Sequence, residues 1–172
     1  MGAEISHAVI GEKRFAYTTE RSDISSLVPL SATTVLDLGC SNGSLGSMLK
    51  RAKHDRFVWG VEIDHVLAVE AAKELDRVSC LDLEEAITRD TFAGRTFDCV
   101  IAADVLEHLR YPENLLGSID EVLNDEGVLI VSLPNIRHHS VAISIFLKGT
   151  FPRRGVEFST LRISAGLLVP MP

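Results

Sequence analysis

The segment VLDLGCSNGSLG, residues 35–46, decides how this 172-residue sequence folds. The short apolar run over 34–38 stops at a glycine, which predicts a buried β-strand. Beyond the turn, apolar side chains recur with the spacing of one helix face, at Leu45, Met48, Leu49 and Ala52. The segment therefore predicts a strand, a tight glycine turn and an amphipathic helix in direct succession.

The same alternation continues along the chain. Further strands are predicted over the apolar runs 57–63, 77–83, 97–104 and 128–134. Helical segments are predicted over 20–28, 64–75, 84–90, from Pro112 onward and over 136–148, with a stop and turn at 124–127. Apolar strands that alternate with helices indicate an α/β fold of the Rossmann-like, doubly wound type, with a mostly parallel sheet and helices on both faces.

Composition narrows the function classes. Acidic residues number 24 and basic residues 17, so the formal net charge is −7. This balance disfavours nucleic-acid binding, because proteins that track a phosphate backbone usually carry a basic excess. No apolar run approaches the ~18 residues of a membrane span, and the start of the chain lacks the pattern of a signal peptide. We therefore expect a cytoplasmic protein, and the length suits a single domain over 1–172.

The three cysteines, Cys40, Cys80 and Cys99, lack C-x-x-C spacing and are odd in number. Each lies among apolar residues, which predicts buried free thiols in a reducing compartment. No metal site is predicted.

The turn between the first strand and its helix has its own chemistry. Gly39 and Gly43 bracket it, and glycine permits positive φ and a close approach of a ligand to the backbone. The spacing G-x-x-x-G matches neither the dinucleotide pattern G-x-G-x-x-G nor a P-loop. Asp37, just before the turn, would repel a pyrophosphate and attract a cationic group such as an ammonium or a sulfonium.

Acidic residues also end the next two predicted strands. Ligands of open parallel sheets bind beyond the carboxyl ends of the strands, so these residues belong to the same predicted site. Glu62 is placed to accept hydrogen bonds from both ribose hydroxyls, and Asp64 to cap the following helix. Asp82 either accepts a hydrogen bond from an exocyclic amine or caps the loop that follows, and Leu83 is placed to pack on a base. The three strand ends together outline S-adenosylmethionine.

On these residues the sequence resembles the class I S-adenosylmethionine-dependent methyltransferases, and most of all bacterial members of small-molecule and glycan pathways. VLDLGCSNGSLG resembles the glycine-rich first motif of the family, with Ser41 where a third glycine is common. Similar segments follow in the family's order at GVEID (60–64), CLDLEE (80–85), FDCVIAADVLEHLRYPENLL (97–116) and EGVLIVSLPN (126–135). The resemblance covers roughly residues 17–150.

The resemblance implies S-adenosylmethionine as the cofactor and S-adenosylhomocysteine as its product. Residues of the first motif would line the methionine part, and Glu62 would hold the ribose. Asp82 and Leu83 would hold the adenine, whereas Ala103 and Asp104 would lie beside the sulfonium and the methyl group. The predicted cofactor-binding residues are Asp37, Gly39, Cys40, Asn42, Gly43, Glu62, Ile63, Asp82, Leu83, Ala103 and Asp104.

The C-terminal part departs from the family pattern, so 151–172 is an atypical tail. After the fifth strand, the family normally adds a sixth strand and an antiparallel seventh strand. Here 156–163 and 167–170 form either a reduced hairpin or an irregularly packed remnant. Without a strand beyond 128–133, that sheet edge would need a partner, a covering helix or a homodimer, formed through the edge strand or the tail.

No catalytic residue follows from these motifs, although several side chains are candidates. His108 lies just past the predicted fourth strand and is either an acid or base for the acceptor or a residue that packs locally. His138 and His139 either face the acceptor or begin a solvated helix. Tyr17 and Arg21 either close over the cofactor or make an ordinary helix contact.

Three functions are consistent with these features. The resemblance implies an enzyme that transfers a methyl group from S-adenosylmethionine to a small-molecule or sugar-type acceptor. The first alternative is a non-catalytic module that binds S-adenosylmethionine or S-adenosylhomocysteine. A more distant alternative is an NAD-dependent oxidoreductase, which the missing G-x-G-x-x-G pattern and Asp37 disfavour.

Overall fold

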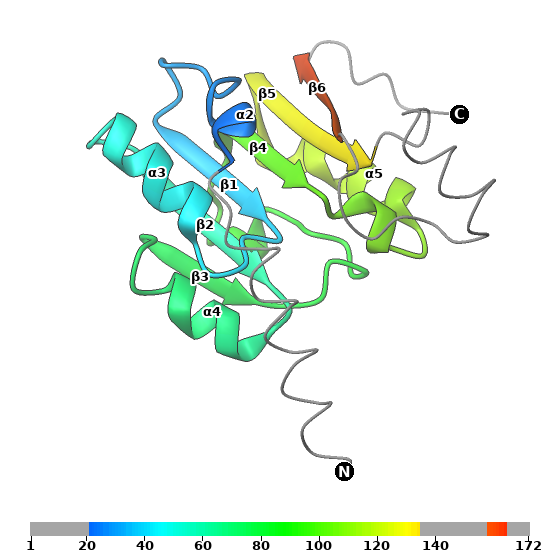
Figure 1. Ribbon diagram of the computed structural model, residues 1–172. Coiled ribbons are helices and arrows are strands. Elements are labelled where there is room, and N and C mark those ends of the chain that lie inside the picture. Colours follow the sequence, from blue (N-terminus) through cyan, green and yellow to red (C-terminus); the bar gives the residue numbers. More distant parts are fainter. Residues whose placement is uncertain (1–20, 135–157, 165–172) are drawn as a thin grey trace, which may run out of the picture.

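The structure is a computed structural model that describes residues 21–134 and 158–164. Its centre is a six-stranded sheet of order β3-β2-β1-β4-β5-β6 (Figure 1). The first five strands run parallel, and β6 runs antiparallel to β5. The order reverses between β1 and β4, and open α/β sheets bind ligands beyond the strands at such a switch point. The strands are β1 (Thr34–Leu38), β2 (Phe57–Glu62), β3 (Arg77–Cys80), β4 (Phe97–Ala103), β5 (Leu123–Pro134) and β6 (Phe158–Ser164).

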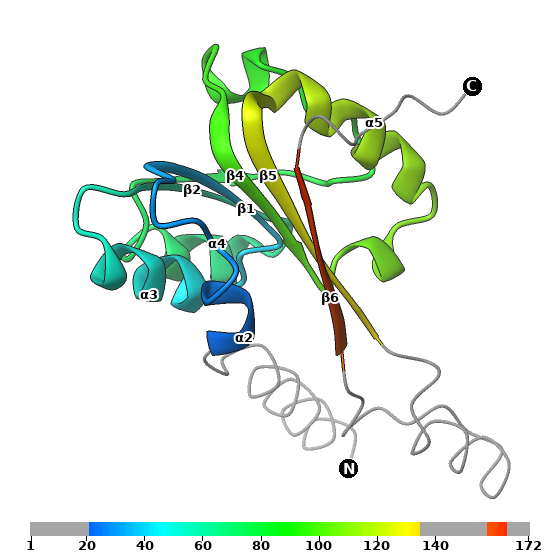
Figure 2. The ribbon, with the colours of Figure 1, turned by 90° about the horizontal axis from the view of Figure 1, so that it is seen from above.

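Helices cover both faces of the sheet, which confirms the predicted α/β fold (Figure 2). One face carries α2 (Ser22–Ser25), α3 (Ser44–Ala52) and α4 (His65–Ala71), and the other carries α5 (Pro112–Val122). Two 3-10 helices, η1 (Asp90–Phe92) and η2 (Leu106–His108), lie in the connections. None of the helices in the described residues is long and apolar enough to cross a membrane.

Each face of the sheet has its own apolar core, because side chains alternate along a strand. Val35 of β1 clusters with Leu49 of α3, whereas its neighbour Leu36 clusters with Ile119 of α5. All four side chains are fully buried. The strands are therefore apolar on both faces, as expected of a parallel sheet covered on both sides.

Two helix starts follow the predicted chemistry. The Asp64 carboxylate accepts hydrogen bonds from the backbone N–H groups of Val66 (2.8 Å) and Leu67 (3.2 Å), so it caps α4 as predicted. Pro112 occupies the first turn of α5, where its missing N–H leaves no helical hydrogen bond unmade.

Some predicted elements differ from the observed ones. The segments predicted over 20–28, 64–75 and 77–83 are longer than α2, α4 and β3. The chain leaves α4 through a turn, closed by the hydrogen bond from Leu75 N–H to the Ala71 carbonyl (2.9 Å), which brings Leu75 into the core. The helical turn predicted over 84–90 is absent, because that connection folds as a loop whose Ile87 is buried in the other core.

The stop predicted at 124–127 lies inside β5 as a bulge. Leu123 pairs with Phe97 and Val128 pairs with Cys99, so the residues between them add length to one strand only. A Cβ at Gly127 would lie 2.6 Å from the Leu123 side chain, so a glycine permits this close return of the chain.

The free edge of β5 is covered by a strand of the tail. β6 pairs with β5 from Val128↔Ser164 to Pro134↔Phe158. Its strand corresponds to the first half of the predicted hairpin, whereas the second half, 167–170, and the helix predicted over 136–148 lie outside the described residues.

The cysteine prediction is correct for two residues and wrong for one. All three thiols are free, and Cys40 and Cys99 are buried. Cys80 is exposed because it ends β3, the edge strand of the sheet.

A carboxylate clamps the sheet at the end opposite the predicted site. Asp98 of β4 accepts hydrogen bonds from the backbone N–H groups of Thr33 (2.8 Å) and Thr34 (3.0 Å) and from the Asn124 amide (2.7 Å). Burial alone would raise the pKa of Asp98, but these hydrogen bonds lower it to about 2. The ionised carboxylate therefore joins β1, β4 and the bulge of β5.

We predict that Asp98→Asn destabilises the protein at pH 7 by about 1.5–3 kcal/mol, the usual value of hydrogen bonds to a charged group. The folded-state pKa lies below the unfolded value, so this stability is present above about pH 4 and is lost as the pH falls toward 2. In urea denaturation, the difference in the free energy of unfolding between wild type and Asp98→Asn should narrow over that pH range. Asp55→Asn, at an exposed carboxylate before β2, is the control, and a gap that stays constant with pH would contradict the assignment.

Candidate functional site

A cavity of about 1270 Å³ lies where β1, β2, β3 and β4 end. It contains every predicted cofactor-binding residue except Gly43, and it also contains His108 and Arg21. Residues that follow each of the four strands line it, within the segments 39–45, 62–67, 81–84 and 103–111. The topology therefore brings together residues that are far apart in the sequence.

The turn after β1 is bent into left-handed backbone conformations. Gly39 has φ +72° and Ser41 has φ +51°. The N–H groups of Gly39 and Cys40 both donate to the Val61 carbonyl, at 2.8 and 2.9 Å, which ties the turn to the end of β2. A Cβ at Gly39 would lie 2.6 Å from the Val105 side chain, so the lack of a side chain lets the turn contact the loop after β4.

Gly43 serves the packing of helices and does not line the cavity. It precedes α3 with φ +83°, and a Cβ there would lie 3.0 Å from the Ala71 Cα of α4. The glycine spacing of the motif thus reflects two different needs. The first glycine lets the turn contact Val105 in the loop after β4, and the second lets α3 begin against α4.

Glu62 ends β2 with its side chain turned inward, 8% exposed. Its Oε2 accepts a hydrogen bond from Ser41 N–H (2.8 Å), and its Oε1 accepts one from Asp64 N–H (2.9 Å). Each carboxylate oxygen has a second lone pair for a ligand hydroxyl. Glu62 therefore holds the glycine turn and the start of α4 in place while facing the cavity.

Asp37 is the most unusual group of the site, because it is a carboxyl buried in a central strand. It is 2% exposed, and among the described residues its Oδ2 and the Ser41 Oγ are the buried side-chain atoms without a hydrogen-bond partner. Burial raises the pKa of Asp37 to about 7, the negative charge of Glu62 adds to the rise, and Arg21 opposes it. Such a group gains stability from a cationic ligand that brings both a donor and a positive charge.

The end of β3 supplies a polar and an apolar residue. Asp82 is exposed, and its Oδ1 accepts a hydrogen bond from Glu84 N–H (2.9 Å), so it caps the loop that follows. Leu83 is buried at 9% exposure and belongs to the apolar core. Both line the cavity, so the local cap is compatible with a contact to a ligand.

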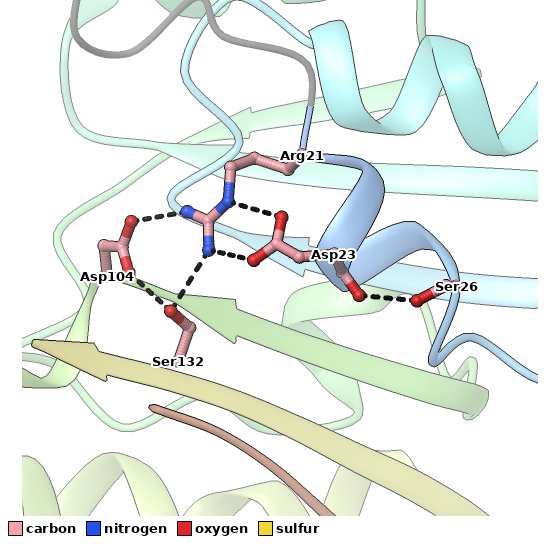
Figure 3. A network of polar contacts seen from close by, with 5 residues as sticks. All are labelled: Arg21, Asp23, Ser26, Asp104 and Ser132. Carbon is pink, nitrogen blue, oxygen red and sulfur yellow. Dashed lines mark hydrogen bonds and ion pairs between the residues drawn. The ribbon is translucent and has the colours of Figure 1, made fainter. Parts of the chain in front are cut away.

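The end of β4 carries the second residue of the site, other than glycine, with a left-handed backbone conformation. Asp104 has φ +57°, a conformation that costs a residue other than glycine about 1–3 kcal/mol, although Asp tolerates it better than most. Arg21, at the start of α2, forms an ion pair with Asp104, and Ser132 of β5 donates a hydrogen bond to it (Figure 3). Figure 3 shows these side chains converging from three segments.

Two contacts of the site were not predicted from the sequence. Ser132 is fully buried within the apolar run of β5, and a lone hydroxyl in such a run was the available clue. Glu84 accepts a hydrogen bond from Arg110 N–H (2.8 Å), which joins the loops after β3 and β4 across the cavity wall. This bond uses a backbone donor, so no residue pattern indicates it.

The remaining candidates have different positions. His108 is exposed in η2 and lines the cavity, so it remains a candidate for proton transfer. Tyr17, His138 and His139 lie outside the described residues. Within the described residues, no group of three or more His, Cys, Asp or Glu side chains is arranged to hold a metal ion.

The sequence is similar to known methyltransferases. A family described as "Methyltransferase domain" matches residues 36–129. The ubiquinone biosynthesis O-methyltransferase of Azorhizobium caulinodans is 32% identical over 125 residues, which cover 72% of this chain and 49% of that protein. The chain thus spans about half the length of this relative.

Solved structures share the fold. The plantazolicin methyltransferase BpumL, in complex with a monoazolic desmethylPZN analog and SAH, matches with a TM-score of 0.58 and 16% identity, over 78% of this chain and 51% of that chain. The [4+2]-cyclase SpnF matches with a TM-score of 0.55 and 22% identity, over 68% of this chain and 43% of that chain. At these identities the likeness shows the fold alone, and one fold supports different reactions.

The buried Asp37 predicts a pH dependence of stability. Its folded-state pKa of about 7 lies above the unfolded value near 3.9, so the native state keeps a proton that the unfolded state releases. Stability should therefore fall as the pH rises from about 4 to about 7. Asp37→Asn stays neutral, and its free energy of unfolding should increase relative to wild type over this range.

Urea denaturation at pH 5, 6, 7 and 8 measures this difference. Asp120→Asn, on the exposed side of α5, should follow the wild-type profile. A difference between Asp37→Asn and wild type that does not change with pH would refute the raised pKa.

Proposed function

Because the chain belongs to the class I S-adenosylmethionine-dependent methyltransferases, we propose that it binds S-adenosylmethionine in the cavity beyond β1–β4 and transfers the methyl group to a small molecule. The observation that carries the proposal is the succession of carboxylates along one cavity wall, Asp37 near the end of β1, Glu62 at the end of β2 and Asp82 just after β3. Their order matches the order of the ammonium end, the ribose and the adenine in this ligand.

The residues fit the cofactor at its charged end. The unpartnered Asp37 Oδ2 requires a donor, and the ammonium of the cofactor carries both donors and a positive charge. Gly39 lets the turn pack against Val105 in the same cavity wall, and the nearby Ser41 Oγ is a second buried atom that lacks a partner. A ligand without a donor at this position would leave Asp37 Oδ2 unsatisfied, and a cationic donor would also stabilise the ionised carboxylate.

The middle and far parts of the cavity also suit this ligand. Glu62 keeps lone pairs for the two ribose hydroxyls while its backbone contacts fix its position. Leu81 and Leu83 offer apolar surface for a base beside the Asp82 carboxylate. We propose the same set of cofactor-binding residues as the sequence predicts, without Gly43.

The cavity size supports a second ligand. Pockets for one small molecule typically measure about 300–1,000 Å³, and this cavity measures about 1270 Å³. The cavity wall also includes His108 and Tyr111, which are both exposed to solvent. A small acceptor, including one of the sugar type, would bind beside these two side chains.

The chain's own contribution to the reaction is placement. When bound, the cofactor supplies an electrophilic methyl group on a positively charged sulfur. Asp37 and Glu62 orient the cofactor, while Leu45 and Val105 add apolar wall that excludes water. Oriented proximity of this kind supplies about 7–11 kcal/mol of barrier lowering. His108 is the candidate to take a proton from an acceptor hydroxyl.

We predict that Glu62→Gln weakens the binding of S-adenosylhomocysteine by about 10–100-fold, because hydrogen bonds to a charged group contribute about 1.5–3 kcal/mol. Isothermal titration calorimetry measures the dissociation constant, and Glu85→Gln, an exposed residue after β3, is the control.

The ligand can be varied to separate a ribose contact from a loosened turn. An S-adenosylhomocysteine analogue without the ribose hydroxyls should bind wild type more weakly than the parent ligand. Glu62→Gln should bind both ligands with similar affinity. Equal losses in wild type and variant would mean that Glu62 does not bind the ribose.

A further inference from the structure

Arg21 connects three segments that are remote in the sequence. Its Nη1 donates to Asp104 Oδ2 at 2.5 Å, and its Nη2 donates to Ser132 Oγ at 3.2 Å. Ser132 Oγ in turn donates to Asp104 Oδ1 at 2.7 Å. A second carboxylate, Asp23, binds the same guanidinium through two contacts of 3.1 Å (Figure 3).

These contacts fix Asp104 in the cavity wall. Both of its carboxylate oxygens have partners, and its backbone N–H donates to the Ser132 carbonyl at 3.1 Å. The left-handed backbone of Asp104 persists because several groups hold it at once. The next residue, Val105, fills the space that Gly39 leaves open, so the position of Asp104 is coupled to the glycine turn.

Among the residues that the structure describes, acidic groups dominate the charged lining of the cavity. They come from every strand end, whereas the arginines that line it are Arg21 and Arg110. An ion pair with a guanidinium reduces the charge that a carboxylate presents to other ligands. The ion pair with Arg21 therefore reduces the negative charge that Asp104 presents to the cavity. The acidic lining residues are Asp37, Glu62, Asp64, Asp82, Glu84 and Asp104.

We propose that Arg21 is a positioning and specificity residue that masks Asp104, so that the cavity does not bind the cationic cofactor much more tightly than its neutral-sulfur product. This rests on the proposed function, in which Asp104 lies beside the sulfur of the cofactor. The positive charge leaves the sulfur as the methyl group departs. An exposed carboxylate there would stabilise the cofactor more than the transition state and would slow the transfer.

The test compares two ligands that differ at the sulfur. S-adenosylmethionine carries a sulfonium and S-adenosylhomocysteine a neutral thioether, while their ammonium, ribose and adenine are the same. The ratio of their dissociation constants, measured by calorimetry on the full chain, isolates the charge felt at the sulfur. Arg21→Met keeps most of the side-chain length and removes the charge.

Arg21→Met should shift this ratio in favour of S-adenosylmethionine by about tenfold or more, because a charge within about 4–6 Å changes a charge equilibrium by at least that factor. In an Asp104→Asn background the same change should leave the ratio unaltered, and Arg21→Lys should keep the wild-type ratio. Arg110→Met is the control, since it removes a positive charge from the same cavity but not from Asp104.

The proposal is wrong if Arg21→Met weakens the binding of both ligands equally, as loss of a purely structural residue would. It is also wrong if Arg110→Met shifts the ratio by the same factor, as a general charge effect would. Should Arg21→Met fail to fold, Ser132→Ala exposes the other oxygen of Asp104 and must shift the ratio in the same direction. Failure of either ligand to bind wild type would contradict the proposed function itself, whereas binding with an unshifted ratio contradicts only the masking by Arg21.

Discussion

A buried carboxyl group in the central strand, with one oxygen that lacks a hydrogen-bond partner, is the constraint on which the site depends. Asp37 occupies a position of β1 that an apolar side chain would fill at lower free energy, and its Oδ2 has no hydrogen-bond partner. The negative charge of Glu62 makes ionisation harder still. A fold that retains such a group in the wall of a cavity is suited to a cationic ligand.

The cavity wall also contains strained backbone. The turn after β1 and the loop after β4 each contain a residue other than glycine in a left-handed conformation, Ser41 and Asp104. Glu62 holds the first through its hydrogen bond with Ser41 N–H, and Arg21 with Ser132 holds the second. Side chains remote in the sequence thus offset the backbone strain, and one of them, Arg21, also balances the negative charge of the wall.

Local patterns were sufficient to predict the parallel strands and most of the residues that line the cavity at the ends of these strands. Apolar runs located β1, β2 and β4, and strand ends located Asp37, Glu62 and Asp82, because the geometry of a parallel sheet gathers these ends. Sequence patterns did not predict the features that depend on contacts between remote parts of the chain. The bulge of β5, the pairing of β6 and the network of Arg21 with Asp104 and Ser132 depend on partners 24 to 111 residues away. Gly43 fits the motif because α3 begins close to α4 at this position, and the sequence does not show that contact.

The central claim, that this cavity accepts a nucleoside with a cationic amino-acid end, is tested most directly by a thermal-shift comparison of ligands. S-adenosylhomocysteine should raise the melting temperature, and the rise should grow with ligand concentration, because a ligand that binds only the native state stabilises it by mass action. NAD and ATP, whose phosphates would meet Asp37 and Glu62, should leave the melting temperature unchanged. Stabilisation by NAD or ATP with no response to S-adenosylhomocysteine would contradict the account.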